Sequence, residues 1–404
     1  MLGIARDQIA RGNNQYAPAQ GFPVLREAVA RHQRDYYDMD VDPDTEVLIT
    51  VGATEALTAA IIGLVEPHED VIVLEPYFDS YAAAIALAGT HRIAVPLAPN
   101  NNSWNLDITA LRDAITPQTR MIIVNSPHNP TEAVFSKEAI TELCALATEN
   151  DLIVVSDDVY KHMLFDDTTH RPIATYEVMR ERTITISSAT PPLIAAIQRV
   201  KQYLSFVGAS PFQPAVVYAL DNEREWITHQ QRMLQGNRDL LSHALKNAGF
   251  HVSNTKATFY IVADSCDLST RDGPDFCYNL IADYNVAAIP ISVFTDHLKP
   301  WVTKKLHFTF GNSLKKQHRL LLVPADKDWG FYEGTLQKRG GVGRNIALLF
   351  IPKCNGTRLN RTRAKGCFWA GGVVGVSGNL QYESVTTKTP TPPGPHPSTH
   401  HGFT

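Results

Sequence analysis

The chain has 404 residues, of which 44% are hydrophobic and 19% are charged, with a formal net charge of −4 at pH 7. This length accommodates more than one hydrophobic core, and the composition is typical of soluble globular proteins. No apolar run approaches the roughly 18 residues of a membrane span, and the first residues lack the apolar segment of a secretory signal. Five cysteines are widely spaced and form no C-x-x-C pair. We therefore expect a cytoplasmic protein with reduced thiols, no metal site and no membrane partner.

The net charge conceals an asymmetry between the two ends of the chain. From Ser313 to the end there are 13 Lys and Arg against 4 Asp and Glu, a local charge of +9, so residues 1–312 carry −13. A basic tail suggests nucleic acid, but this one lacks interleaved aromatic residues or a known binding module. Its end is rich in proline, which predicts disorder. We expect residues 313–404 to form an irregular, basic, partly disordered tail with no nucleic-acid partner.

The first two thirds of the chain alternate between short apolar runs and amphipathic segments. Residues 1–40 read as an incomplete N-terminal arm and a helix over residues 25–37. Strands are then predicted at residues 47–50, 71–74, 91–97, 121–124, 152–155 and 183–186, with helices at 56–65, 107–115 and 137–149 and an Ala-rich helix after residue 81. This rhythm predicts an α/β fold with a mostly parallel sheet and helices on both faces. We expect a large domain over residues 41–222.

The rhythm changes after Pro191. Helices are predicted over residues 197–206 and 223–248, followed by strands at 258–262, 286–289 and 306–310 and a helix at 276–283. This α+β pattern predicts a smaller C-terminal domain over residues 223–312.

Three of the predicted strands end in polar residues. The strand at 121–124 leads into Asn125 and Asn129, the strand at 152–155 into Asp157 and Tyr160, and the strand at 183–186 into Ser188. Ligands of parallel sheets bind beyond the carboxyl ends of the strands, so these residues should line one crevice. A buried carboxylate at Asp157 is unfavourable unless it is paired. A protonated ring nitrogen would be a suitable partner, and capping of the following turn is the alternative.

The start of the helix that follows residue 50 is a candidate anion site. Gly52, Ala53 and Thr54 offer free backbone N–H groups at a helix N-terminus, although an ordinary N-cap explains them as well. No G-x-G-x-x-G sequence is present here, which disfavours a nucleotide-dependent dehydrogenase. Phe78 or Tyr77 could supply a flat face for an aromatic ligand. Together these residues describe a site for a planar heterocycle with a phosphate, a basic ring nitrogen and a phenolic oxygen.

Six segments in this order carry a resemblance to a known family. They are Tyr16 in Asn-Gln-Tyr, Gly52-Ala-Thr-Glu-Ala, Glu75-Pro-Tyr-Phe-Asp, Asn125-Ser-Pro-His-Asn-Pro-Thr, Ser156-Asp-Asp-Val-Tyr and Thr185-Ile-Ser-Ser-Ala. Over residues 14–312 the chain resembles the class I/II pyridoxal-phosphate-dependent aminotransferases of fold type I, in the branch with kynurenine, methionine and succinyldiaminopimelate aminotransferases. The resemblance implies pyridoxal 5'-phosphate as cofactor, and an amino acid and a 2-oxo acid as substrates. It also implies a homodimer in which Tyr16 reaches the partner's site.

The resemblance also implies roles for individual residues. Ala53, Thr54 and Ser188 would hold the phosphate, and Phe78 would stack on the pyridine ring. Asp157 would pair with the ring nitrogen and so keep the cofactor an electron sink. Asn129 and Tyr160 would bind the 3-oxygen of the ring. The residues expected at the substrate are Tyr16, Asn129 and His307.

The chain departs from the family at functional positions. The family has a Schiff-base lysine and a further strand after the Ser-Ser-Ala segment, whereas here Ala189 is followed by Thr190-Pro-Pro. Roughly fifteen residues are missing near 189–190, including the lysine that performs the chemistry. His307 replaces the arginine that clamps the substrate carboxylate, Glu132 replaces a glycine and Asp158 a glutamate. We expect an aminotransferase-family protein with no catalytic lysine and impaired activity. The alternative is an inactive cofactor-binding relic or a truncated product that forms heterodimers.

Overall fold

The computed structural model describes residues 1–310 with the exception of residues 101, 187 and 285. By its internal contacts the chain divides at Ile351 into two units, and every described residue belongs to the first unit. The predicted basic tail, residues 313–404, lies outside the described residues.

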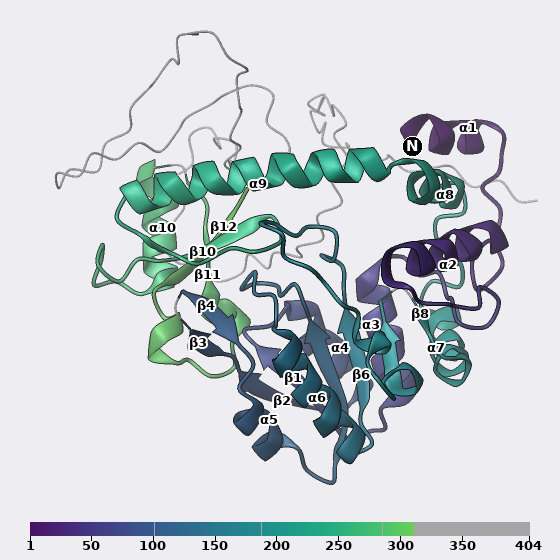
Figure 1. Cartoon of the computed structure of the whole chain (residues 1–404), viewed down its shortest axis with the longest axis horizontal. Coiled ribbons are helices and arrows are strands. Elements are labelled where there is room, and N and C mark those ends of the chain that lie inside the picture. The colour runs from purple at the N-terminus through teal and green to yellow at the C-terminus, as the bar shows by residue number, and fades with distance from the viewer. Residues whose placement is uncertain (101, 187, 285, 311–404) are drawn as a thin grey trace, which may run out of the picture. The chain divides into compact units, whose positions relative to one another are not determined.

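The larger sheet is mostly parallel, as the sequence predicts (Figure 1). Its order is β2 (His91–Pro96), β1 (Asp70–Glu75), β5 (Thr119–Asn125), β6 (Ile153–Asp157), β7 (Thr183–Thr185) and β8 (Ser188–Ala189). The first five strands are parallel, and β8 runs antiparallel to β7. The register pairs Asn125 with Asp157, so the polar ends of β5 and β6 meet at the carboxyl edge of the sheet.

Helices cover both faces of this sheet because alternate strand residues point to opposite sides. Val71 and Val73 join one apolar cluster with residues of α3 (Ala53–Leu64), α4 (Asp79–Ala88) and α7 (Pro191–Leu204). Ile72 and Leu74 join a second cluster with residues of α5 (Ile108–Ala114) and α6 (Lys137–Glu149). The predicted α/β layering is therefore confirmed. Within the described residues, no helix is both long and apolar enough to cross a bilayer.

The C-terminal described part forms an antiparallel sheet in the order β11 (Ile289–Pro290), β12 (Lys305–Thr309), β10 (Tyr260–Asp264) and β9 (His251–Val252). The long helix α9 (Arg224–Asn247) and helix α10 (Gly273–Tyr284) pack on this sheet through Leu241, Phe276 and Phe308 (Figure 1). The remaining elements are α1 (Leu2–Ala10), α2 (Pro23–Tyr37), α8 (Gln213–Asn222), the hairpin β3–β4 (Ala98–Asn100 and Ser103–Asn105) and four 3₁₀ turns (Ile173–Thr175, Arg180–Arg182, Ile291–Phe294 and Pro300–Val302).

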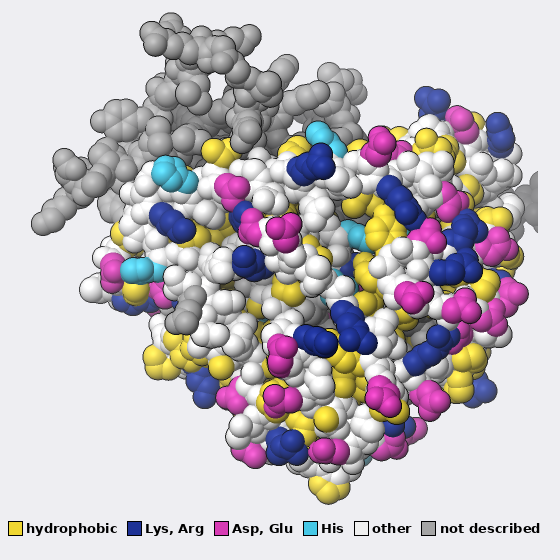
Figure 2. Space-filling model, in the orientation of Figure 1, with side chains coloured by type: hydrophobic (Ala, Val, Ile, Leu, Met, Phe, Trp, Pro, Cys, Tyr) yellow, Lys and Arg dark blue, Asp and Glu magenta, His cyan; other side chains and the backbone are white. Residues whose placement is uncertain are grey.

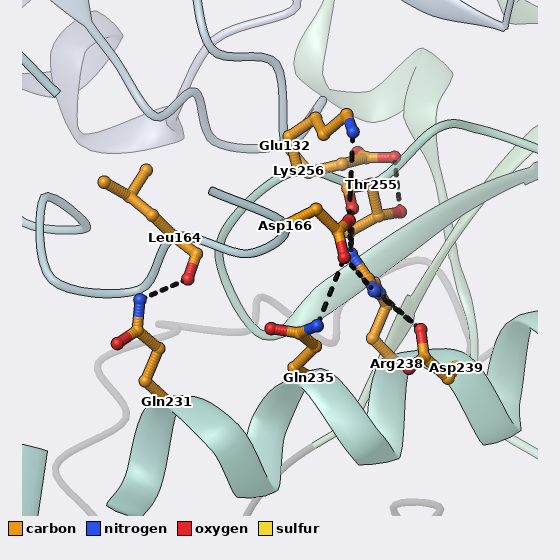
Figure 3. A network of polar contacts seen from close by, with 9 residues as sticks. All are labelled: Glu132, Leu164, Asp166, Gln231, Gln235, Arg238, Asp239, Thr255 and Lys256. Atoms are coloured by element: carbon orange, nitrogen blue, oxygen red, sulfur yellow. Dashed lines mark hydrogen bonds and ion pairs between the residues drawn. The ribbon is translucent and has the colours of Figure 1, made fainter. Parts of the chain in front are cut away.

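Polar and apolar contacts join the two sheets. Val262 of β10 and Ile291 belong to the same apolar cluster as Ile72 and Ile122 of the larger sheet. Figure 3 shows a second connection, in which Arg238 of α9 forms an ion pair with Asp166 of the loop after β6. The Arg238 guanidinium also donates to the Thr255 carbonyl at 3.0 Å. An apolar cluster and the contacts of the buried Arg238 therefore both help to join the two sheets.

One predicted strand is wrong. Residues 47–50 have the apolar composition of a strand but form none in the structure. The Ile49 N–H donates to the Gln20 carbonyl at 2.9 Å, and the Glu46 carbonyl accepts from the Ala189 N–H at 3.1 Å. A strand needs a continuous ladder with a neighbour, and these isolated bonds provide none.

Charged side chains are dispersed on the face that Figure 2 presents. Lys and Arg alternate there with Asp and Glu. Among the described residues on this face, no broad single-sign surface of the kind that binds a polyanion is visible.

Candidate active site

Asp157 is the last residue of β6, and its side chain is 4% exposed. The Tyr81 hydroxyl donates to Oδ2 at 2.6 Å, whereas Oδ1 has no hydrogen-bond partner among the described residues. The pKa of the Asp157 carboxyl is raised to about 6, because the effect of burial outweighs the lowering effect of the Tyr81 bond and the neighbouring Asp158 charge acts in the same direction as burial. A buried acceptor without a partner is unfavourable, so a ligand that donates a hydrogen bond to Asp157 Oδ1 would be stabilised there.

The polar residues after β5 lie beside Asp157, as the register requires. The Asn125 amide donates to the Asp157 carbonyl at 2.7 Å, and its oxygen accepts from the Asn129 N–H at 2.7 Å. The Asn129 amide in turn donates to the Tyr160 hydroxyl at 3.3 Å. The structure therefore brings together Asn129, Asp157 and Tyr160, three of the four residues predicted to contact the cofactor ring.

Phe78 joins this group through Tyr81. Phe78 is the half-buried residue that precedes α4, and its ring lies edge-on to Tyr81 with centroids 5.8 Å apart. Tyr81 is the residue that holds Asp157. The predicted ring-stacking residue and the predicted partner of the ring nitrogen are therefore one side chain apart.

Gly52, Ala53 and Thr54 begin helix α3. Gly52 precedes the helix with φ +84°, in the range that favours glycine. No side chain caps the helix start, so no capping side chain accepts from its first backbone N–H groups. Leu57, one turn further along α3, shares an apolar cluster with Tyr81, which connects this helix to the Asp157 group. Ser188 lies in β8, where its backbone pairs with Thr185.

His307 lies on β12 and is 8% exposed. Its ring packs on Tyr260 with centroids 4.3 Å apart, and Tyr260 in turn lies 5.9 Å from Tyr160. Neither ring nitrogen of His307 has a hydrogen-bond partner among the described residues. Burial lowers the pKa of His307 to about 4, so the ring is neutral at pH 7. A neutral imidazole cannot form the two parallel bonds by which arginine clamps a carboxylate.

Tyr16 stands apart from these residues. Its side chain is 80% exposed, and its ring contacts Phe206 edge-on at 5.5 Å. The expected contact of Tyr16 with a partner subunit stays a prediction.

The chain turns directly from β8 into helix α7 at Thr190, without an intervening lysine. The next lysine, Lys201, is 1% exposed and donates to the carbonyl groups of Ala19 at 3.1 Å and Phe206 at 2.6 Å. Burial lowers the pKa of Lys201. Because its ammonium is held by two backbone carbonyls, Lys201 is not available as a replacement for the missing lysine.

Two buried residues near the site have contacts that the sequence alone does not reveal. Tyr81 holds Asp157, yet in the sequence it is one of several aromatic residues near a helix start. Glu132 has φ +53° and a carboxylate that accepts from Val262 N–H at 3.2 Å and Thr255 Oγ1 at 3.3 Å. The left-handed backbone explains the glycine that the family has here, and the structure shows what the glutamate side chain contacts.

The fold and the site define a fold type I α/β protein with a buried acid at the carboxyl edge of its parallel sheet. The description "Aminotransferase class I and II" fits the chain over residues 4–190 and again over residues 178–313. This chain belongs to that family. The two matched segments overlap at residues 178–190, so the match is interrupted in the stretch that holds β7 and β8.

Several known aminotransferases are similar along most of their length. A probable N-succinyldiaminopimelate aminotransferase of Mycobacterium tuberculosis is 45% identical over 312 residues, covering 73% of this chain and 79% of the relative. The methionine aminotransferase of Escherichia coli is 33% identical over 335 residues, covering 79% and 85%. The solved structure of N-succinyldiaminopimelate aminotransferase from Mycobacterium tuberculosis matches with a TM-score of 0.74 and 43% identity, covering 76% of this chain and 84% of that one.

Proposed function

We propose that this chain binds pyridoxal 5'-phosphate without a covalent link to lysine. We also propose that this chain carries out the reaction of its family, amino-group transfer between an amino acid and a 2-oxo acid, only in impaired form. One observation carries the cofactor assignment. The buried carboxyl of Asp157 has one oxygen held by Tyr81 and the other without a partner among the described residues. A protonated pyridine nitrogen is a cationic donor that satisfies this oxygen.

The other residues fit the same cofactor. The uncapped start of α3 offers Ala53 and Thr54 N–H groups to a phosphate, and Ser188 would add a hydroxyl. Phe78 would cover the ring, while Asn129 and Tyr160 would bind its 3-oxygen. The bound cofactor would supply an electron sink for the substrate amine.

The proposed impairment follows from the absence of the family's Schiff-base lysine after Ala189. In the family this residue both attaches the cofactor and moves a proton at the substrate Cα. Lys201, the next lysine after Ala189, is not placed to do both, because it is held by two carbonyl groups. His307 is neutral and would hold the substrate carboxylate more weakly than arginine. We further propose a cytoplasmic homodimer in which Tyr16 contacts the partner.

A binding titration tests the cofactor assignment. Pyridoxal phosphate is added to the full chain, and binding is followed by equilibrium dialysis. Asp157→Asn removes the charge from the acceptor, so affinity should fall by about tenfold or more, since a hydrogen bond to a charged group contributes roughly 1.5–3 kcal/mol. Asp113→Asn, an exposed carboxylate on α5, is the control and should bind normally. Equal affinity of both variants would contradict the proposal.

A chemical trap tests the missing lysine separately. Borohydride added to the loaded protein should leave no stoichiometric cofactor bound to lysine, as measured by mass spectrometry of the intact chain. A single modified lysine at full occupancy would show that another residue has taken over. Amino-group transfer assayed with a panel of amino acids and 2-oxo acids would distinguish an impaired enzyme from an inactive binding protein.

A further inference from the structure

A cavity lies beside the start of α3, and the proposed function uses only its rim at Gly52 and Ala53. Its volume is about 460 Å³, within the range of small-molecule sites. Its walls come from α2, α3, α7, α8 and the ends of β7 and β8. Apolar side chains form most of the lining, among them Leu25, Val29, Ile184, Ile194, Ile197 and Val216.

This cavity differs from the candidate cofactor site. The two share Gly52 and Ala53 at the start of α3. Phe78, Asn129 and Asp157, which define the ring end of the cofactor site, do not line the cavity. The apolar body of the cavity therefore lies apart from the ring end of the proposed cofactor site, and the inference that follows does not require the chain to bind pyridoxal phosphate.

Three polar side chains, those of Lys161, His32 and His162, lie together in one part of the cavity wall. Lys161 contributes an ammonium that donates to Gln33 Oε1 at 3.3 Å and lies 5.0 Å from the centre of the Tyr37 ring. His32 and His162 face each other with their Nε2 atoms 2.8 Å apart. Burial lowers the pKa of both imidazoles to about 4, so both are neutral at pH 7. Lys161 is then the one cation among the described lining residues, and no Asp or Glu is among them.

One further feature favours an anion in this cavity. Thr185 lines it, is 3% exposed, and its hydroxyl has no hydrogen-bond partner among the described residues. A ligand oxygen would satisfy this hydroxyl. Burial lowers the pKa of Lys161, and the negative charge of Asp158, which lies outside the lining and accepts from the Ser156 hydroxyl at 2.7 Å, raises it. A ligand anion would therefore meet the Lys161 ammonium and the Thr185 hydroxyl.

We propose that this cavity is a binding site for an amphipathic monocarboxylate of medium chain length. The hydrocarbon body fills the aliphatic space between α2 and α7. The carboxylate lies toward Lys161 and Thr185. Apolar burial stabilises the body in proportion to its length, and the cation distinguishes a carboxylate from the corresponding alcohol.

Calorimetric titration of the full chain with octanoate tests this site. Hexanoate, octanoate and decanoate should bind with affinity that rises by about fourfold for each added CH₂ group until the cavity is full. Octanol should bind at least about tenfold more weakly than octanoate, because it lacks the charge that Lys161 attracts. Absence of binding by octanoate and decanoate at millimolar concentration would overturn the proposal.

Two variants locate the bound molecule. Val29→Phe fills part of the cavity and should weaken octanoate binding by at least about tenfold, while Val24→Phe on the exposed side of the same helix should not. Lys161→Met should remove the preference for octanoate over octanol, and Lys161→Arg should keep it. Circular dichroism checks that each variant is folded. Octanoate binding that survives Val29→Phe, or a preference that survives Lys161→Met, would contradict the assignment.

Discussion

His307 is a buried residue whose ring nitrogens are both without a partner among the described residues. His307→Phe keeps the ring shape and the contact with Tyr260 but removes two unsatisfied polar atoms. Since such atoms carry a penalty of roughly 1–3 kcal/mol when buried, we expect the variant to unfold at higher urea concentration, with about 1 kcal/mol more stability at pH 7. Urea titration measures it. A large loss of stability would show that the ring nitrogens have a partner in solution.

The same histidine gives a pH prediction. The folded pKa values of His32, His162 and His307 are lowered to about 4, below the unfolded value of 6.5. The unfolded chain therefore binds more protons between these values, so the free energy of unfolding falls as the pH drops from 6.5 toward 4. His307→Phe removes one of these groups. Its stability should decline less steeply than that of the parent, by at most about 2 kcal/mol at pH 5.

Single residues were predictable from sequence where chemistry and position coincide. Asp157 follows a buried apolar strand, and that combination alone indicates a paired or functional acid. Tyr81 was not predictable as the partner of Asp157, because the bond joins residues 76 positions apart. Only the packing of α4 against the sheet brings them together. Long-range partners of this kind leave no local pattern in a single sequence.

At the scale of elements, Glu132 connects the loop after β5 to β10. Glu132→Ala removes the bonds to Val262 and Thr255 but keeps the left-handed backbone. Glu132→Gly removes the same bonds and relieves the backbone, because a side chain in this conformation is unfavourable by roughly 1–2 kcal/mol. We expect both variants to be less stable than the parent. The free energy of unfolding of the Gly variant should be about 1 kcal/mol higher than that of the Ala variant. Equal stability of the two in thermal denaturation would argue against backbone strain at this position.

Most helices and strands were predictable because their apolar residues recur at the spacing of a helix or form short continuous runs typical of buried strands. Helix α6 begins at Lys137 and ends at Glu149, as the pattern and the Ser136 cap require. Residues 47–50 show the limit of this approach. Their composition is that of a strand, but a strand exists only with a neighbour, and β8 beside them has two residues. Which segments lie side by side depends on the whole chain.

At the scale of the molecule, the shared apolar cluster and the Arg238 contacts predict cooperative unfolding of the described part. Arg238→Leu leaves the Thr255 carbonyl without its donor and removes the ion pair with Asp166, so stability should fall by about 1–3 kcal/mol. Arg232→Leu, an exposed residue on the same helix, is the control. Circular dichroism and tryptophan fluorescence should report one coincident transition for the parent. Two separate transitions would show that the sheets unfold independently.

The pair of Arg238 and Asp166 has a consequence for recombination. The two residues lie 72 positions apart, on either side of the predicted domain boundary at residues 222–223. A chimera that takes residues 223–310 from a relative inherits a new residue at position 238 and keeps the old Asp166. Unless the donor also supplies arginine there, Asp166 loses its Arg238 partner and depends on the contacts of positions 235 and 256, which the donor also replaces. Successful crossovers between this chain and its relatives should therefore fall before Asp166 or preserve both residues.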